Sequence, residues 1–575
     1  KQTVKGDHRS SRTSRARPDA AAGHYVLSYL DLKAKTHLGL LQHCCRGDAG
    51  DVTFRVGRQS KLVVIDDPNS RLIRPPYGHF VERYAQCKPK TIESAHHVGY
   101  GCRGYDANFL HKFPLSSRNV LSLPNRLVAD GDRGQQCPNS VRQSMQYFST
   151  NRRSPDATFE EAVLRGQPDD KGLYFPATIP KLSAVFLGEL PNKANDEIAF
   201  EVIRPYVGGC IPDERLHAIC SETVNFPFPI VQISDNISAL ELFHGPTLAF
   251  KDVGARFMSR CLQHFSAERD GKTIVIVATS GDTGGAVANG FYGVEGVEVI
   301  ILYPKGKVSK VQELQLTTLG GNVTTLELHG TFDDCQRLAK QTLADADLNA
   351  KAFVTSANSI NVARWLPQQF YYFFALKNWQ GEPPVVSVPS GNFGNLASGV
   401  LANMSGLPVR GFIAACNAND VVPDFFETGD YKPKPSVSTL SNAMDVGDPS
   451  NFVRILEIFE KNVATLRTRI SAVSISDERT AGTMREVQSN YGYVLDPHGA
   501  VAYTALADHI KEHPGQRGIM LETAHPVKFD SVPEIIGREV AVPDSISSLF
   551  TKPKVSIQIE ADYHTVRDII LEKAK

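Results

Sequence analysis

The feature that most constrains the fold of this chain is a repeated unit of apolar strand, small-residue loop and helix. In one copy, residues 273–279 (TIVIVAT) run into Ser280–Gly285 (SGDTGG) and then into a helix predicted from about Ala286. Short β-branched runs bounded by glycine are typical of buried strands, and strands that alternate with helices indicate βα units. The predicted fold class is therefore α/β, with mostly parallel sheets and flanking helices.

A second copy of this unit, and further elements of the same kind, lie after residue 145. The second copy runs from a strand at 385–388 through Ser390–Asn395 (SGNFGN) into a helix at 396–404. The pattern also predicts strands at 239–243, 297–303, 323–328 and 412–417, helices at 159–164 and 333–344, and an extended segment at 172–180.

Composition divides the chain near Met145. The 575 residues are 42% hydrophobic, which is enough for a sizeable core. Residues 1–144 hold 23 Lys and Arg against 12 Asp and Glu, whereas the rest hold 39 against 50, and all six methionines lie from Met145 onward. Such an asymmetry indicates two kinds of sequence. We predict a basic extension at 1–144, an N-terminal domain at 145–229 and a catalytic region of two α/β subdomains at 230–575.

Residues 1–144 lack clear periodicity, and three interpretations are open for them. The first is translated upstream sequence, because residue 1 is Lys and Met145 is the first methionine. The second is a targeting or disordered extension, since its first residues are rich in Arg and Ser. The third is a small domain without a recognisable pattern. We favour the first interpretation.

Charge and cysteine content argue against several classes of partner. The 62 basic and 62 acidic residues give a net charge of zero, so we expect neither nucleic acid nor a membrane surface as partner. No stretch approaches 18 consecutive apolar residues. The ten cysteines form no C-x-x-C pair, so no metal site is expected. The five after Met145 are expected to be core residues in a reducing compartment, which favours the cytoplasm.

A lysine with candidate chemistry lies in LFHGPTLAFKDVG, residues 242–254. A predicted strand runs into a Gly-Pro turn there, and Lys251 follows between apolar neighbours and a predicted helix. The carboxyl end of a parallel strand projects residues toward the usual ligand crevice. Partial desolvation there would lower the pKa of Lys251 and free its amine for Schiff-base chemistry. The alternative is a solvated lysine near a helix start.

The loops SGDTGG and SGNFGN are both candidates for binding an anion. Each lies where a strand ends and a helix begins, so its backbone amides can hold a negative group. Gly391 and Gly394 would let the backbone approach a ligand closely. Neither loop has the spacing of a Walker motif or of a dinucleotide fingerprint. The alternatives are plain helix capping by Ser280, Asp282 and Thr283, and a tight turn at 390–395.

One ligand would use the lysine and both loops together. A small cofactor that carries a phosphate and binds covalently to a lysine fits a lysine and two anion-binding loops at the carboxyl edge of an α/β sheet. Pyridoxal 5′-phosphate (PLP) has these properties, and we predict it as the cofactor.

Eight ordered blocks resemble signature segments of the threonine synthase family, in the longer form found in bacteria and fungi. They are LFHGPTLAFKDVGARFM, VATSGDTGGAVANGFYG, ILYPKGKVSKVQELQLTTLGGNV, TSANSINVARW, VSVPSGNFGNLASG, TLSNAMDVGDPSNF, LDPHGAVAY and ETAHPVKF. The similarity begins at about Met145 and extends to the C-terminus. It implies a fold-type-II PLP-dependent enzyme, similar to the tryptophan synthase β chain, with a small N-terminal capping domain.

The resemblance also implies an activity and a set of site residues. The family converts O-phospho-L-homoserine and water to L-threonine and phosphate, as a monomer or homodimer. By motif, Lys251 is the Schiff-base lysine, and Thr523 faces the pyridine nitrogen. The implied cofactor-phosphate residues are Gly391, Asn392, Phe393, Gly394 and Asn395. The implied substrate-carboxylate residues are Ser280, Gly281, Asp282 and Thr283. Candidate cations for the substrate phosphate are Lys305, Lys307, Arg256 and Arg364, of which we favour Lys307 and Arg364.

Two other functions remain open at this point. One is another fold-type-II lyase, such as a dehydratase, which would form 2-oxobutanoate from threonine. The other is a degenerate homologue that binds a metabolite without turnover. The intact lysine and both intact loops favour a catalyst over a binding protein.

Overall fold

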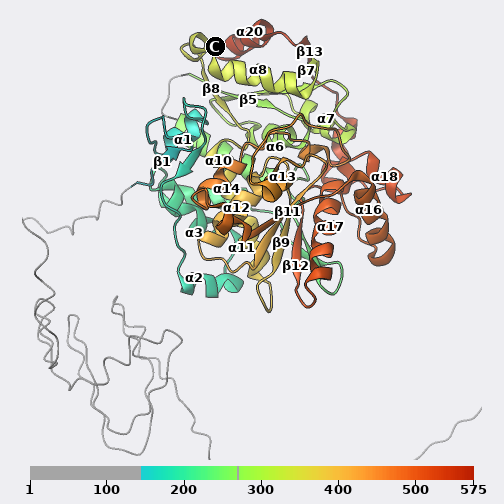
Figure 1. Ribbon diagram of the computed structural model, residues 1–575. Helices are drawn as coiled ribbons and strands as arrows, with labels where there is room; N and C mark the ends of the chain where they lie inside the picture. The colour runs from blue at the N-terminus through green and yellow to red at the C-terminus, as the bar shows by residue number, and fades with distance from the viewer. Residues whose placement is uncertain (1–143, 268–270) are drawn as a thin grey trace, which may run out of the picture. The chain divides into compact units, whose positions relative to one another are not determined.

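The larger of the two mostly parallel sheets carries more than half of the predicted site residues beyond the ends of its strands, and its strands β9, β11 and β12 are labelled in Figure 1. The structure is a computed structural model that describes residues 144–267 and 271–575. This sheet has the strand order β11-β10-β9-β12-β4-β3, with parallel neighbours except for the antiparallel edge pair β3–β4. Its strands are β3 (Ile230–Gln232), β4 (Ile237–Glu241), β9 (Val385–Pro389), β10 (Gly411–Cys416), β11 (Ile470–Ser474) and β12 (Gly518–Glu522).

The second sheet has five parallel strands in the order β13-β7-β6-β5-β8. Four of these strands are inserted in the chain between β4 and β9 of the larger sheet, so the segment after β4 leads from one sheet to the other. The predicted α/β class with mostly parallel sheets is confirmed. The strands are β5 (Thr273–Ala278), β6 (Val297–Pro304), β7 (Val323–His329), β8 (Phe353–Ser356) and β13 (Ile557–Glu560), with a separate antiparallel pair of β1 (Tyr147–Ser149) and β2 (Tyr174–Pro176).

Helices connect the strands and cover the sheets, as α8 and α20 cover the five-stranded sheet in Figure 1. The α-helices are α1 (Phe159–Arg165), α2 (Ala184–Glu189), α3 (Asn195–Val207), α4 (Asp213–Thr223), α5 (Lys251–Ser266), α6 (Asp282–Phe291), α7 (Lys310–Thr317), α8 (Phe332–Ala344), α9 (Ala346–Asn349), α10 (Val362–Trp365), α11 (Phe370–Lys377), α12 (Gly394–Met404), α13 (Val421–Thr428), α14 (Phe452–Ile458), α15 (Val463–Arg467), α16 (Asp477–Tyr491), α17 (Pro497–Glu512), α18 (Ser531–Ile536), α19 (Asp544–Ser547) and α20 (Tyr563–Lys573). The 3₁₀ helices are η2 (Leu190–Asn192), η3 (Leu366–Gln369), η4 (Asn442–Met444), η5 (Pro526–Lys528) and η6 (Ser548–Thr551).

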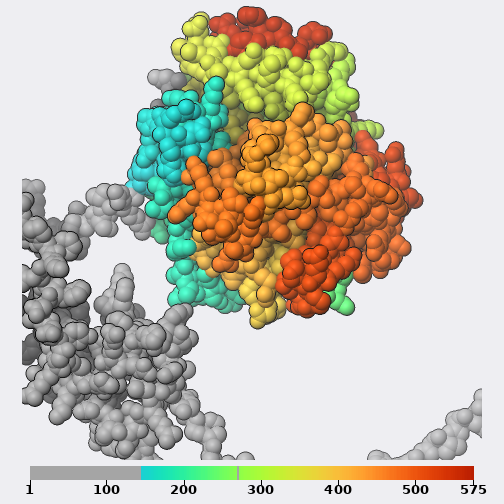
Figure 2. Space-filling view, viewed as in Figure 1, coloured from blue at the N-terminus to red at the C-terminus, as the bar shows by residue number. Residues whose placement is uncertain are grey.

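The N-terminal segment at 145–229 packs into the same apolar core as the two sheets. That core includes Tyr147 and Phe159 together with Val277 of β5 and Val388 of β9. Figure 2 shows the start of the described chain against the segment that contains α14. The buried guanidinium of Arg454 in α14 donates to a carbonyl of β2 across this contact. The boundary at 229/230 stays a prediction.

The predicted strands agree with the structure to within about two residues, but two helix starts are corrected. The helix expected from about Ala286 begins at Asp282, because Gly281 alone completes the turn with φ +139°. The two glycines that follow are helical, and a side chain at Gly284 would lie 2.5 Å from Leu316 Cδ2. Lys251 is itself the first residue of α5, rather than a residue of the preceding loop.

The expectations about membrane spans and about cysteines can be compared with the described residues only. Across 144–267 and 271–575, no helix combines the length and the apolar character needed to cross a bilayer. The interpretations of residues 1–143 lie outside the described residues. Of the five later cysteines, four are buried and Cys210 is partly buried.

Candidate active site

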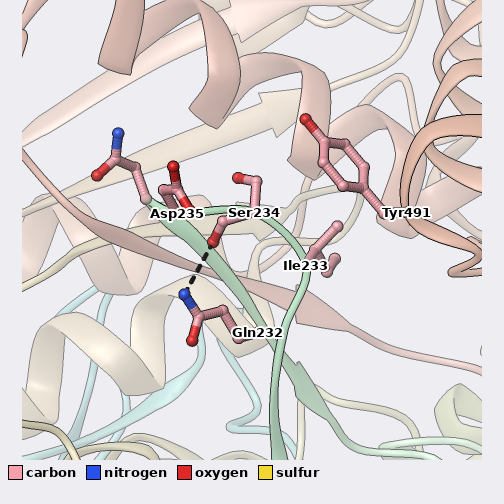
Figure 3. Close-up of a pocket in the computed structure, with 6 residues that line it drawn as sticks. Gln232, Ile233, Ser234, Asp235 and Tyr491 are labelled. Atoms are coloured by element: carbon pink, nitrogen blue, oxygen red, sulfur yellow. Dashed lines mark hydrogen bonds between the residues drawn. The ribbon is translucent and has the colours of Figure 1, made fainter. Parts of the chain in front are cut away.

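A surface hollow lies at the amino end of β4, away from the carboxyl edge of the larger sheet. It measures about 610 Å³ and is lined by residues 232–236 and Tyr491. Figure 3 shows it beside the turn that leads into β4, where the Gln232 amide donates to the Ser234 carbonyl. This turn precedes β4, whereas ligands of parallel α/β sheets bind beyond the carboxyl ends of the strands. The predicted site residues lie instead beyond the carboxyl ends of β4, β9 and β12.

Three neighbouring strands of the larger sheet, in the order β9-β12-β4, end at that opposite edge. The segments that follow β4 and β12 run side by side, since Phe250 N–H donates to the Thr523 carbonyl at 2.9 Å and His525 N–H to the Leu248 carbonyl at 3.0 Å. This pairing places Lys251 next to the segment that carries Thr523. The end of β5 joins them, because Lys251 Nζ lies 3.9 Å from Asp282 Oδ2. Lys251, Thr523 and the SGDTGG loop therefore meet.

Lys251 is held in a largely desolvated position at the first turn of α5. Its side chain is 18% exposed, and its Nζ lies 5.5 Å from the centre of the Phe250 ring. Burial lowers the pKa of the Lys251 amine, and the positive charges of Lys528 and Arg364 lower it further, while Asp282 opposes them. A lower pKa makes the neutral, nucleophilic amine more accessible at neutral pH.

The loop before Lys251 is fixed by the buried carboxylate of Asp252. This carboxylate accepts the Thr247 hydroxyl and, at 3.0 Å, the Thr247 amide. A Cβ at Gly245 would lie 2.5 Å from Asp252 Oδ2, so glycine is required there for the turn to close. Tyr371 also donates its hydroxyl to the Phe250 carbonyl. These contacts hold the backbone on both sides of the lysine.

The SGDTGG loop satisfies part of its own hydrogen-bonding capacity. The hydroxyl of Thr279 accepts the amides of Gly281 and Gly284, each at 2.9 Å. Within the described part of the chain, the amides of Asp282 and Thr283 and the hydroxyls of Ser280 and Thr283 have no protein partner. These groups remain available to an anion. The carboxylate of Asp282, by contrast, brings a negative charge to the same loop.

The carboxylate of Asp282 is bound by a second lysine that the sequence analysis missed. Lys528 Nζ lies 3.0 Å from Asp282 Oδ1 and 2.6 Å from the Thr247 carbonyl, and its side chain is 0% exposed. Gln312 Nε2 donates to the same Oδ1 at 2.9 Å. A signal was present, because Lys528 lies in the quoted block ETAHPVKF between two apolar residues. An apolar setting of that kind is unusual for a solvated lysine.

The SGNFGN loop presents unused donors. Phe393 adopts φ +60°, and α12 begins at Gly394 without a side-chain cap. Among the described residues, the amides of Asn392, Phe393, Gly394 and Asn395 donate to no protein acceptor. Asn395 Nδ2 is buried and also lacks a partner. Buried donors without partners at a helix N-terminus fit an anion such as the PLP phosphate.

Neighbouring segments hold this loop in its shape. A Cβ at Gly391 would lie 2.5 Å from Met444 Cα, so the η4 segment packs directly against the glycine backbone. The side chain of Asn392 donates to the Ser359 hydroxyl at 2.8 Å and accepts the Ser450 amide at 2.7 Å. The side chain of Asn392 therefore has a structural role, and its backbone amide is the group left free for a ligand.

Thr523 follows β12 and is 7% exposed. The residue before it, Glu522, is buried together with Asp496, and Glu522 Oε1 accepts the Asp496 backbone amide at 2.7 Å. His498 Nδ1 lies 2.6 Å from Asp496 Oδ1, and His498 Nε2 accepts the Ala443 amide at 3.1 Å. Burial raises the pKa of Glu522, and the nearby charge of Asp496 raises it further. His498 is therefore a core residue with both ring nitrogens bonded.

The four candidate cations differ in where the structure places them. Arg364 is 4% exposed, donates Nη1 to the Ala357 carbonyl at 2.6 Å, and has a buried Nε without a partner. Its α10 backbone lies against Gly254 of α5, and burial lowers the pKa of its guanidinium to about 10. Lys307 is exposed in the turn after β6. Lys305 bonds Gln558, and Arg256 bonds the Glu222 carbonyl, so neither points into the site.

Comparison with known proteins agrees with this geometry. Residues 146–224 match the family model "Threonine synthase N terminus", 232–521 match "Pyridoxal-phosphate dependent enzyme" and 499–570 match "Threonine synthase, C-terminal". A threonine synthase of Haemophilus influenzae is 42% identical over 432 residues, which cover 74% of this chain and 100% of that protein. The chain belongs to the threonine synthase family.

Solved structures of the threonine synthase family resemble this chain over the same portion. The crystal structure of threonine synthase from Escherichia coli has a TM-score of 0.70 at 41% identity and covers 74% of this chain and 100% of its own. The PLP-bound threonine synthase from Brucella melitensis has a TM-score of 0.70 at 33% identity and covers 75% and 100%. The predicted fold-type-II class and the predicted cofactor are therefore confirmed.

Proposed function

We propose that this chain is a PLP-dependent threonine synthase that converts O-phospho-L-homoserine and water to L-threonine and phosphate. The observation that carries this proposal is that a largely desolvated lysine, Lys251, lies beside the SGDTGG loop and at the same sheet edge as the SGNFGN loop, and both loops offer unpaired donors. Membership of the threonine synthase family supports the choice of this reaction over others of the same fold.

The residues present fit the cofactor. Lys251 would bind it covalently, and the amides of residues 392–395, with Asn395 Nδ2, would hold its phosphate. The hydroxyl of Thr523 would face the pyridine nitrogen and, being neutral, would not force its protonation. When bound, PLP stores the electron pair left by proton removal from the carbon beside the substrate amine.

The protein's own groups would bind the substrate and move its protons. The free amides of Asp282 and Thr283 and the hydroxyl of Ser280 would bind the substrate carboxylate, on the side of the loop away from the Asp282 carboxylate. Lys251 would act as general base at the α carbon, since its lowered pKa favours the neutral amine. A second proton would then leave the β carbon and phosphate would leave the γ carbon. The γ carbon would be reprotonated, water would add at the β carbon, and a proton would return to the α carbon.

The leaving phosphate requires a cation. Arg364 is the stronger candidate, because its buried Nε has no protein partner and its charge already influences Lys251. Lys307 would contribute only if the exposed turn after β6 approaches the bound substrate. The proposal also includes a cytoplasmic location and a monomer or homodimer, with the substrate rather than nucleic acid or a membrane as partner. Sedimentation of the full chain would measure the oligomeric state.

The test is a mass balance on the full chain loaded with PLP. Incubation with O-phospho-L-homoserine should release phosphate and threonine in equal amounts, whereas a dehydratase would form 2-oxobutanoate from threonine. Lys251→Ala should lower turnover by at least about 10³-fold, the scale of a lost acid–base group. Lys305→Ala is the matched control, since this lysine bonds Gln558 outside the site. No turnover by the PLP-loaded native chain would indicate a binding protein instead.

A further inference from the structure

Lys528 is a fully buried lysine that none of the proposed steps uses. Its side chain is 0% exposed, and its Nζ bonds the Thr247 carbonyl at 2.6 Å and Asp282 Oδ1 at 3.0 Å. A buried ammonium is costly unless it is paired and hydrogen-bonded, and these two acceptors meet that requirement. Both acceptors belong to segments that contact Lys251, since Thr247 lies in the loop before it and Asp282 faces its amine.

The bonds to Asp282 determine which of its oxygens is free. Lys528 and Gln312 both donate to Oδ1, at 3.0 and 2.9 Å. The remaining oxygen, Oδ2, is the one that faces Lys251 Nζ, at 3.9 Å. This separation is within ion-pair range but longer than a hydrogen bond. Asp282 can therefore orient the Lys251 amine without fixing it in place.

The charges of Lys251, Asp282 and Lys528 explain why a second lysine is needed to neutralise Asp282. One carboxylate lies between two ammonium groups. When Lys251 has no charge, as in its proposed roles, Asp282 would be a lone buried anion if Lys528 were absent. Burial alone would raise the pKa of Asp282. The positive charge of Lys528, followed by that of Lys251, outweighs burial and holds this pKa well below its usual range.

We propose that Lys528 is a positioning residue for Lys251, acting through Asp282: it keeps the carboxylate ionised and turned toward the lysine while Lys251 itself is neutral. This inference rests on the proposed role of Lys251 in the function above. Lys528 does not touch the reacting atoms in this account, because both of its bonds go to the protein. The charged groups that face Lys251 are Asp282, Lys528, Arg364 and Asp496.

The test follows the pH dependence of PLP uptake by the cofactor-free full chain, read from the absorbance change on binding. Lys528→Met removes one positive charge and leaves Asp282 to hold the Lys251 ammonium alone. The midpoint pH of uptake should rise by about one unit, which slows uptake about tenfold below the midpoint. Asp282→Asn should lower the midpoint, and the double variant should match Asp282→Asn, because Lys528 acts through the Asp282 carboxylate. Lys528→Arg, which keeps the charge, should restore the native midpoint.

Matched variants separate this inference from the proposed function. Lys377→Met removes a lysine that also bonds a backbone carbonyl, that of Lys193, but lies outside the site, and it should leave the midpoint unchanged. If the native chain takes up no PLP, the proposed function fails. If it takes up PLP and the midpoint of Lys528→Met equals or falls below the native value, the inference is overturned. If Lys528→Met does not fold, a double variant whose midpoint lies well above that of Asp282→Asn overturns it equally, because Lys528 would then act on Lys251 directly.

Discussion

The two loops SGDTGG and SGNFGN have almost the same sequence pattern but differ in what they offer a ligand. In the first, Thr279 accepts two of the loop amides, and the Asp282 carboxylate brings a negative charge that Lys528 neutralises. In the second, four consecutive amides and the buried Asn395 Nδ2 have no protein partner among the described residues. The SGDTGG loop therefore contains a carboxylate, that of Asp282, whereas the SGNFGN loop presents only unpaired donors.

The third position of each loop accounts for much of this difference. It is Asp282 in the first loop and Asn392 in the second. A carboxylate in the first turn of a helix interacts favourably with the helix dipole, so Asp282 offsets part of the positive end of α6, although the amides of Asp282 and Thr283 stay free. The amide of Asn392 has no charge and instead ties the loop to Ser359 and Ser450. A strand–loop–helix pattern alone therefore does not identify an anion site.

The largest expected effect comes from removing the internal anion of the first loop. Asp282→Asn leaves Lys528 buried without a counter-ion, and breaking a buried pair in this way costs about 3–5 kcal/mol. The free energy of unfolding in urea should fall by that amount in the cofactor-free chain. Asp334→Asn is the control, because Asp334 lies in the exposed capping box of α8 and its substitution should lower the stability far less than that of Asp282. A loss below 1 kcal/mol for Asp282→Asn would mean that the buried pair is not formed.

The second prediction concerns a negative charge introduced into the SGNFGN loop. Asn395→Asp replaces the unpaired donor Nδ2 by an oxygen beside free amides. We expect the affinity for PLP to fall about 100-fold, since a hydrogen bond to a charged group is lost and a like charge is added. Pyridoxal without its phosphate is the control ligand and should bind as in the native chain. Equal weakening for both ligands would place Asn395 away from the phosphate.

The third prediction separates two glycines of the same loop. A Cβ at Gly391 would lie 2.5 Å from Met444 Cα, so Gly391→Ala must displace backbone and should cost about 1–3 kcal/mol of stability. At Gly394 the nearest atom would be Asn451 Nδ2 at 3.5 Å, so Gly394→Ala should leave the cofactor-free stability unchanged and weaken PLP binding only. Urea unfolding without PLP, followed by PLP titration, measures both. Equal destabilisation by both substitutions would refute the distinction.

The sequence predicted the elements that depend on local pattern. The strand at 297–303 is found as β6 (Val297–Pro304), and the helix at 333–344 as α8 (Phe332–Ala344), because periodicity and caps are encoded within a few residues. The helix expected from Ala286 begins earlier, because packing against Leu316 makes glycine acceptable inside α6. Tertiary packing overrode the local preference there.

The sequence could not predict which charged side chains form ion pairs in the folded chain. Lys528 and Asp282 are far apart in the chain and are paired only by the fold, so no local pattern identified the pair. Arg256 was a candidate phosphate-binding cation, although Arg364 was favoured, and only the fold shows that Arg256 bonds the Glu222 carbonyl in α4. Lys251 could be proposed as the Schiff-base lysine from the sequence, because it lies with its neighbours in one continuous segment that resembles a family block.

The last expected effect concerns acid, which should destabilise the η5 segment that contacts the first loop through Lys528. His525 precedes η5, the helix that carries Lys528, and its Nδ1 accepts the Val527 amide at 3.1 Å. Burial lowers the pKa of His525 to about 4, and the nearby His244 contributes to this. The unfolded chain binds a proton near pH 6.5, so stability should fall as the pH drops from 6.5 toward 4, by up to about 1.4 kcal/mol per pH unit. His525→Asn keeps an acceptor for the Val527 amide without titrating, and urea unfolding across this range should show a shallower loss for the variant. Identical slopes would mean that the ring is already solvated, and the acid sensitivity of η5 would then have to come from another group.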